Sequence, residues 1–321
     1  LINSGFLPHL KQSLQNAAGL SPLLNIVTSP SDPALYQGPP RLPDSSSRVP
    51  MRLTETEKAI RRDVEAWQHA DASVLTQAMN WAMRPVDWTV DRFAPPDVID
   101  RVTENIHRFL STLTDASEWT YEASDIITAA QQRGLPAETI GDLRSQPIDD
   151  LDALARSRFR QNTILAALEG GGTGLGGAVL IAADVPLLFT INLRLIQQIG
   201  ASYGFPMRGP QFRPLVLSIF NIAASGGREA RNEALREVSV AAASFANDLE
   251  YKGRVSGTFR DQNRHLPREI AKALVGRKIG QAIPLAGAAI GAGVNYWFTQ
   301  ETAEAAFMCF RAMYLDWKER L

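Results

Sequence analysis

Apolar residues recur at helical spacing through most of the chain after residue 54. Val98, Val102, Ile106 and Phe109 show the i, i+3, i+4 pattern that places side chains on one face of a helix. The sequence contains no convincing alternation of period two and no repeat of fixed length. We therefore expect an all-α fold, a multi-helix bundle with Ala/Gly-rich central helices.

Capping and breaking residues place the helix boundaries. Thr54 and Glu57 have the spacing of a capping box, and Gly226 follows an apolar helix as a stop signal. Helices are expected from 54 onward and at 75–93 with a break at Pro85, 97–113, 118–133, 138–144, 149–169, 185–200, 211–224, 228–248, 279–300 and 301–320.

Proline content divides the chain into two parts. Residues 1–50 hold 8 of the 19 prolines, whose fixed φ angles and missing N–H groups oppose regular structure. We predict a proline-rich flexible leader at 1–50 and a single all-helical domain at 51–321. No signal peptide is recognisable, because no apolar stretch follows the first basic residue, Lys11.

The stretch 169–204 joins a glycine cluster to a long apolar run that contains ionisable and amide side chains. If a helix runs from 185 to 200 with Asp184 as its N-cap, a helical wheel places Thr190, Arg194, Gln197 and Gln198 on one face and Asn192 on the opposite, apolar face. Two interpretations stay open. Asp184 is a cap and Asn192 a satisfied core amide, or they belong to a polar pocket whose candidate residues are Glu169, Asp184, Asn192, Arg194 and Tyr203.

Two familiar motifs in this stretch lack their usual context. Gly172, Gly174 and Gly177 spell G-x-G-x-x-G, but a helix-like segment precedes them where a dinucleotide fold has a strand. Ser202 lies in a G-x-S-x-G pattern with His265 downstream, but it follows a predicted helix, whereas a nucleophile elbow follows a strand. We expect no cofactor. The four scattered histidines and the single cysteine, Cys309, likewise predict no metal site.

Charge is unevenly distributed although the net charge is only −1, which argues against nucleic acid as the main partner. Residues 97–157 contain 12 acidic and 5 basic residues, whereas residues 251–278 contain 8 basic and 2 acidic ones. This basic segment is typical of a stretch that contacts anionic lipid, with Arg268, Lys272, Arg277 and Lys278 as candidate contacts. A solvated helix face, or pairing with the acidic region, explains the same charges. The uncharged segment 279–300 has the length of a membrane span, but its glycines, Pro284 and Asn295 also suit a buried core helix.

Several short motifs resemble the EcsC protein family. They are Glu169-Gly170, Thr173-Gly174, Gly176-Gly177, Asp184-x-Pro186-Leu187, Asn192-Leu193-Arg194 and Tyr203-Gly204, with Gly134-x-Pro136 and Leu151-Asp152 upstream and Ile283-Pro284 to Asn295 downstream. The resemblance extends over residues 60–320. It implies a helical, often hydrophobic bacterial protein, named after the third gene of an ABC-transporter operon linked to secretion, and it supplies no catalytic residues.

The functional expectation is a non-enzymatic, membrane-associated protein of EcsC type, accessory to transport or secretion. Its partner would be a membrane surface or a membrane protein such as an ABC transporter, at the inner face of the membrane in the cytoplasm. The alternative is a hydrolase with a polar pocket around Glu169, Asp184 and Asn192, or around Ser202 and His265.

Overall fold

The computed structural model describes residues 52–79, 100, 103–105, 108–109, 121–173, 177–247, 270 and 287–321, without the side chains of most residues in 160–186 and of 287–291. All described residues belong to the unit Arg48–Leu321. The predicted leader therefore lies outside the described residues, as do the four candidate lipid contacts, Arg268, Lys272, Arg277 and Lys278.

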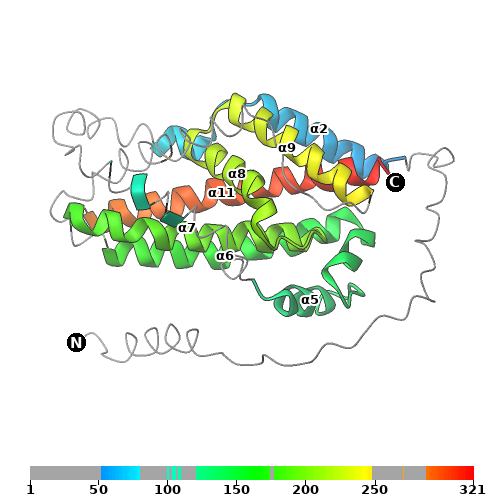
Figure 1. Cartoon of the computed structure of the whole chain (residues 1–321), viewed down its shortest axis with the longest axis horizontal. Coiled ribbons are helices and arrows are strands. Elements are labelled where there is room, and N and C mark those ends of the chain that lie inside the picture. The colour runs from blue at the N-terminus through cyan, green and yellow to red at the C-terminus, as the bar shows by residue number, and fades with distance from the viewer. Residues whose placement is uncertain are drawn as a thin grey trace, which may run out of the picture. The chain divides into compact units, whose positions relative to one another are not determined.

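The described part of the chain is built of helices and contains no strand, which confirms the all-α prediction (Figure 1). The named elements are α2 (Glu55–His69), α5 (Ala123–Gln131), the 3₁₀ helix η3 (Ile140–Ser145), α6 (Ile148–Thr173), α7 (Gly177–Ser202), the 3₁₀ helix η4 (Pro210–Phe212), α8 (Arg213–Ser225), α9 (Arg228–Ala246) and α11 (Gly287–Lys318).

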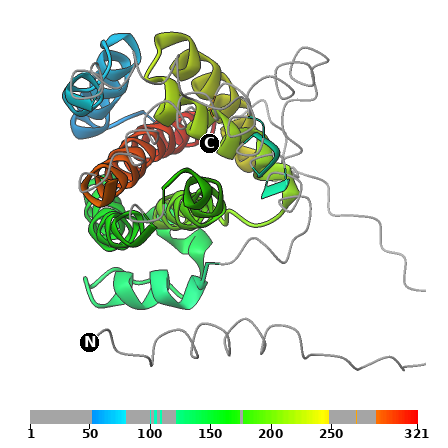
Figure 2. The same cartoon turned by 90° about the vertical axis from the view of Figure 1, so that its left-hand side faces the viewer.

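Helix α11 is the axis of this bundle. It packs against α6 and α7 on one side and against α2, α8 and α9 on the other, as the end-on view shows (Figure 2). Its buried residues explain this position, because apolar side chains face every neighbour: Val294, Trp297, Phe298, Phe307 and Phe310 are all at most 1% exposed. A helix that is apolar nearly all round is stable only when other helices surround it.

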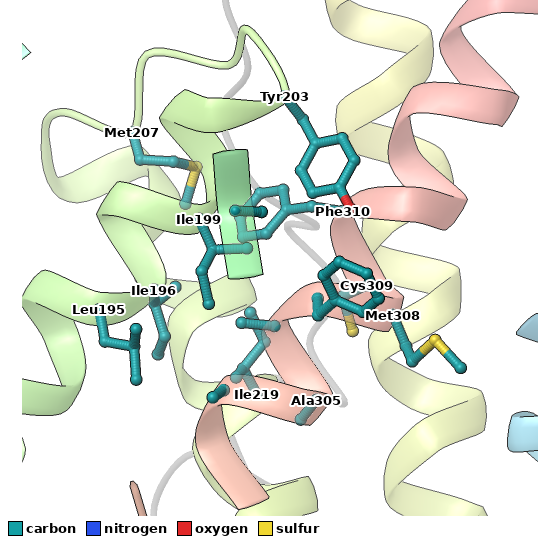
Figure 3. Packing of buried hydrophobic residues seen from close by; sticks show 14 of the residues in the cluster. Leu195, Ile196, Ile199, Tyr203, Met207, Ile219, Ala305, Met308, Cys309 and Phe310 are labelled. Carbon is teal, nitrogen blue, oxygen red and sulfur yellow. The ribbon is translucent and has the colours of Figure 1, made fainter. Parts of the chain in front are cut away.

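Close packing of α11 on α7 depends on a glycine. A Cβ atom added at Gly200 would lie 2.6 Å from Cγ of Met207 and 2.7 Å from Cζ of Phe310. Figure 3 shows Ile199, Met207 and Phe310 gathered at this end of α7. The helices can approach this closely because Gly200 has no side chain.

The predicted capping box at the start of α2 is confirmed. The Glu57 amide donates to Thr54 Oγ1 over 3.2 Å, and the Thr54 amide donates to Glu57 Oε2 over 2.8 Å. The other end of α2 is capped by the buried Arg231 of α9, which donates to the carbonyl oxygens of Trp67 at 3.1 Å and Ala70 at 2.6 Å. A distant arginine thus supplies donors to carbonyl groups at the end of the helix, where the next helical turn is missing.

Three predicted boundaries are wrong. The helix predicted at 118–133 begins at Ala123, and Tyr121 and Glu122 lie outside it. Helix α7 begins at Gly177, so Asp184 lies inside the helix, where it cannot serve as the N-cap. The predicted helices 279–300 and 301–320 form, from Gly287 onward, one continuous helix of 32 residues. Buried contacts on both sides of Glu301 stabilise this continuity, although the sequence changes there from uncharged to charged. No described helix combines the length and the hydrophobicity that a membrane span requires.

Candidate functional site

Asn192 lies in the core of the bundle, fully buried on α7. Its Nδ2 donates to the Leu188 carbonyl over 2.7 Å and to Thr299 Oγ1 of α11 over 3.1 Å. Its Oδ1 has no hydrogen-bond partner among the described residues. The expectation that Asn192 needs an internal hydrogen bond is therefore confirmed for its amide nitrogen.

The register of α6 against α7 places the other members of the predicted polar pocket. Asn162 of α6 donates to Gln198 Oε1 of α7 over 3.0 Å, and the two helices run antiparallel. Counting seven residues forward from Asn162 on α6 and seven back from Gln198 on α7 brings position 169 level with position 191, next to Asn192. Asp184 is eight residues from Asn192 on the same helix, so the two positions are about 12 Å apart along the axis. The side chains of Glu169 and Asp184 lie outside the described residues.

The polar face predicted for α7 is only partly correct. Thr190 and Arg194 are exposed as expected, but Gln197 and Gln198 are 1% and 6% exposed. Helix α6 is responsible at Gln198, because it supplies the donor from Asn162 that allows this amide to be buried. Arg194 therefore points away from the buried amides, and the structure does not bring it together with Tyr203.

Tyr203 belongs to a buried ionic cluster at the other end of α7. Its hydroxyl donates to Asp152 Oδ1 of α6 over 2.5 Å. Arg311 of α11 donates from Nε to both Asp152 oxygens at 3.1 Å, and its Nη2 also contacts Oδ2. Asp152 is 7% exposed, Arg311 8% and Tyr203 not at all. We call Asp152, Tyr203 and Arg311 the buried triad.

The Phe307 ring and a second carboxylate, that of Asp63, lie beside the buried triad. The Arg311 guanidinium lies 4.3 Å from the centre of the Phe307 ring, and its Nη1 lies 3.9 Å from Oδ2 of the largely exposed Asp63. Burial tends to lower the pKa of Arg311, but the hydrogen bond and the charge of Asp152 raise it overall. Burial and the Asp152 charge hold the pKa of Tyr203 well above its ordinary value. The arginine therefore stays charged and the tyrosine stays a hydrogen-bond donor.

The triad neutralises its own charges, which favours a structural role. It fixes α6, α7 and α11 against one another through one carboxylate that accepts from three donor groups, the Tyr203 hydroxyl and Nε and Nη2 of Arg311. Tyr203 is among the residues predicted from the sequence and Asp152 lies in the Leu151-Asp152 motif, whereas Arg311 was not predicted. The sequence could have indicated that Arg311 is a buried, paired charge, since it follows Phe310 on a helix whose neighbouring positions are apolar.

The described residues offer little for nucleophilic catalysis. Ser202 is fully buried at the end of α7, and its Oγ donates to the Gln198 carbonyl over 2.8 Å. A helix precedes it, so the G-x-S-x-G sequence does not form a strand-to-helix elbow. His265 lies outside the described residues. Burial raises the pKa of the Cys309 thiol to about 12, so this cysteine is protonated at neutral pH.

Metal ligands are not grouped in the part of the chain that the structure describes, where no three His, Cys, Asp or Glu residues could hold one ion.

Comparison with known proteins identifies relatives along most of the chain. A family model described as the EcsC protein family matches residues 58–315. Protein EcsC of Bacillus subtilis (strain 168) is 26% identical over 241 residues, which cover 73% of this chain and 91% of that protein. The uncharacterized protein YdbA of the same strain is 22% identical over 225 residues, which cover 69% of this chain and 80% of that protein. No solved structure matches.

Proposed function

Because the chain belongs to the EcsC protein family, we propose that it is a non-enzymatic helical protein that associates with an anionic membrane surface through its basic segment, residues 251–278. One observation carries the proposal: this segment holds 8 basic and 2 acidic residues in a chain whose net charge is −1. An isolated block of positive charge is attracted to anionic lipid.

The charges of the described bundle support this assignment indirectly. Several of its buried ionic groups are paired within the protein, as in the buried triad and the contact of Lys318 with Glu57. Such groups are already partnered and gain little from a charged surface. No separate stretch of 28 residues holds as many basic residues as this segment, so it is the favoured contact.

The proposed location follows from the lipid. Anionic lipids give the cytoplasmic leaflet a negative surface potential, so the protein would act at the inner face of the membrane. A membrane protein such as an ABC transporter is the alternative partner at this location, and an accessory role in transport or secretion is compatible with either.

Co-sedimentation with vesicles tests the proposal. Each basic residue at the surface contributes about 1 kcal/mol, so replacing Lys272, Arg277 and Lys278 by glutamine should weaken binding to phosphatidylserine-containing vesicles roughly 100-fold. Binding of the wild-type protein should also fall as salt is raised. The matched control replaces three exposed cations of the bundle, Lys58, Arg62 and Arg236, by glutamine, with the same change in net charge.

Equal recovery of the wild-type protein on neutral and anionic vesicles would reject the proposal. Equal losses in the two triple variants would show that net charge, without a localised contact, governs the interaction.

A further inference from the structure

A cleft of 630 Å³ lies at the end of the bundle where α2 begins and α11 ends. The start of α2 and the end of α11 form two of its walls, and the turn that joins η3 to α6 forms the third. Its volume falls in the range of sites for small molecules, about 300–1,000 Å³. None of its lining residues belongs to the buried triad or to the basic segment 251–278, so the proposal made here does not rest on the proposed membrane contact. Its lining includes Thr56, Glu57, Arg144, Tyr314, Trp317 and Lys318.

Both carboxylate oxygens of Glu57, one of the two acidic residues that line this cleft, accept hydrogen bonds. Glu57 has a side chain only 4% exposed, and its Oε1 accepts from Lys318 Nζ over 2.5 Å. Its Oε2 accepts from the Thr54 amide over 2.8 Å. Burial alone would raise the pKa of Glu57, but the hydrogen bonds from Lys318 and Thr54 outweigh it and lower the pKa. Glu57 is therefore a charged anchor that positions the Lys318 ammonium.

The cations in the cleft are held beside aromatic rings. Lys318 Nζ lies 6.0 Å from the centre of the Tyr314 ring, and the Arg144 guanidinium lies 5.4 Å from that of Trp317. An ammonium group has three N–H donors, of which the contact with Glu57 uses one. The rings of Tyr314 and Trp317, whose centres are 5.8 Å apart with an angle of 49° between their planes, provide an apolar surface beside the two cations.

The other acid that lines the cleft is Asp149, which is exposed at the start of α6. Its charge is favourable there because the helix dipole is positive at that end. The negative charges of Glu57 and Asp149 are thus each balanced by a neighbouring positive group or dipole. The two remaining N–H donors of Lys318 can then bind an anion.

From this geometry we propose that the cleft binds a small anionic amphiphile, with its carboxylate or sulfonate at Lys318 and Arg144 and its apolar body against Tyr314 and Trp317. The class is defined by one acidic group and a flat or aliphatic body small enough for the cleft. Cationic amphiphiles of the same length are excluded, because they would bring a positive charge to Lys318.

Binding of 1-anilinonaphthalene-8-sulfonate, a fluorescent aromatic sulfonate, provides the assay. We expect saturable binding of one probe per chain, displaced by decanoate but not by decyltrimethylammonium. Thr56→Trp fills the cleft from an exposed position on α2 and should weaken probe binding at least tenfold. The matched control is Ala66→Trp, an exposed position of the same helix outside the cleft, which should bind as the wild type does.

A double variant, Glu57→Gln with Lys318→Met, tests the anion contact without leaving a buried charge unpaired. Decanoate should bind roughly tenfold more weakly to it, since a single charge-assisted contact is lost, whereas decanol should bind unchanged. Thermal unfolding followed by circular dichroism checks that each variant is folded.

Equal probe affinity in Thr56→Trp and the wild type, or displacement by decyltrimethylammonium, would overturn the cleft assignment. Unchanged decanoate affinity in the double variant would overturn the role of Lys318. The Thr56→Trp variant retains the basic segment and should still sediment with anionic vesicles, so failure of one proposal is distinguishable from failure of the other.

Discussion

Breaking the buried triad should cost far more stability than breaking an ion pair on the surface. The perturbations are Asp152→Asn, which removes the charge but keeps an acceptor for Tyr203, and Arg311→Met, which keeps the length and apolar stem of the side chain. Either change leaves one buried charge uncompensated, and such a loss typically costs about 3–5 kcal/mol.

The groups around the triad determine which of the two variants loses more stability. In Asp152→Asn the guanidinium still lies near Asp63, 3.9 Å from its Nη1, so we expect a loss of about 3 kcal/mol. In Arg311→Met the buried carboxylate keeps only the Tyr203 hydroxyl as a described side-chain partner, so we expect a loss of about 5 kcal/mol. The double variant has no unpaired charge and should lose less than the sum, with a coupling of at least about 2 kcal/mol.

Equilibrium unfolding in guanidinium chloride, followed by circular dichroism, measures all four proteins of this double-mutant cycle. The control cycle uses the exposed pair Arg228 and Asp71, which are 3.0 Å apart with side chains 62% and 85% exposed. Its coupling should not exceed about 1 kcal/mol. Equal couplings in the two cycles, or Arg311→Met unfolding at the wild-type denaturant concentration, would refute the reasoning from burial.

Two further predictions concern packing and pH. Gly200→Ala should lower the free energy of unfolding by about 1–3 kcal/mol, because the added Cβ would lie within 2.7 Å of Met207 and Phe310. An unchanged midpoint in the same unfolding assay would contradict this prediction. The pKa of Glu57 is lower in the folded state than its ordinary value of 4.5, so its contribution is present above that pH and is lost as the pH falls through the folded pKa. The difference in stability between wild type and the Glu57→Gln, Lys318→Met double variant, measured at pH 7 and pH 3, should therefore shrink at pH 3; an unchanged difference would argue against a charged Glu57.

Local signals in the sequence predicted the described helices well. The capping box at Thr54 and the glycine stop at Gly226 are both confirmed, since each depends on a few neighbouring residues. The boundary at Asp184 was wrong for the same reason: a proline at 186 and an acid before it resemble a helix start, yet α7 begins seven residues earlier. Local propensity suggested the cap, and packing of the longer helix overrode it.

The candidate site contains buried residues that the sequence of a single helix could not predict. The burial of Asn192 was predictable from its apolar neighbours on the helical wheel, but the burial of Gln197 and Gln198 was not. A wheel describes one helix, whereas burial depends on which other helices cover it. Gln198 is buried because α6 passes beside it with a donor at Asn162.

The sequence alone determined the helical class, most element boundaries and the membership of the EcsC family, because these follow from periodicity, capping residues and local motifs. Tertiary structure decided which polar groups meet. Asp152 and Arg311 are 159 residues apart in the chain, and Glu57 and Lys318 are 261 apart. No local pattern encodes such pairs, since each forms only when hydrophobic burial brings separate helices together and excludes the water that would otherwise solvate the charges.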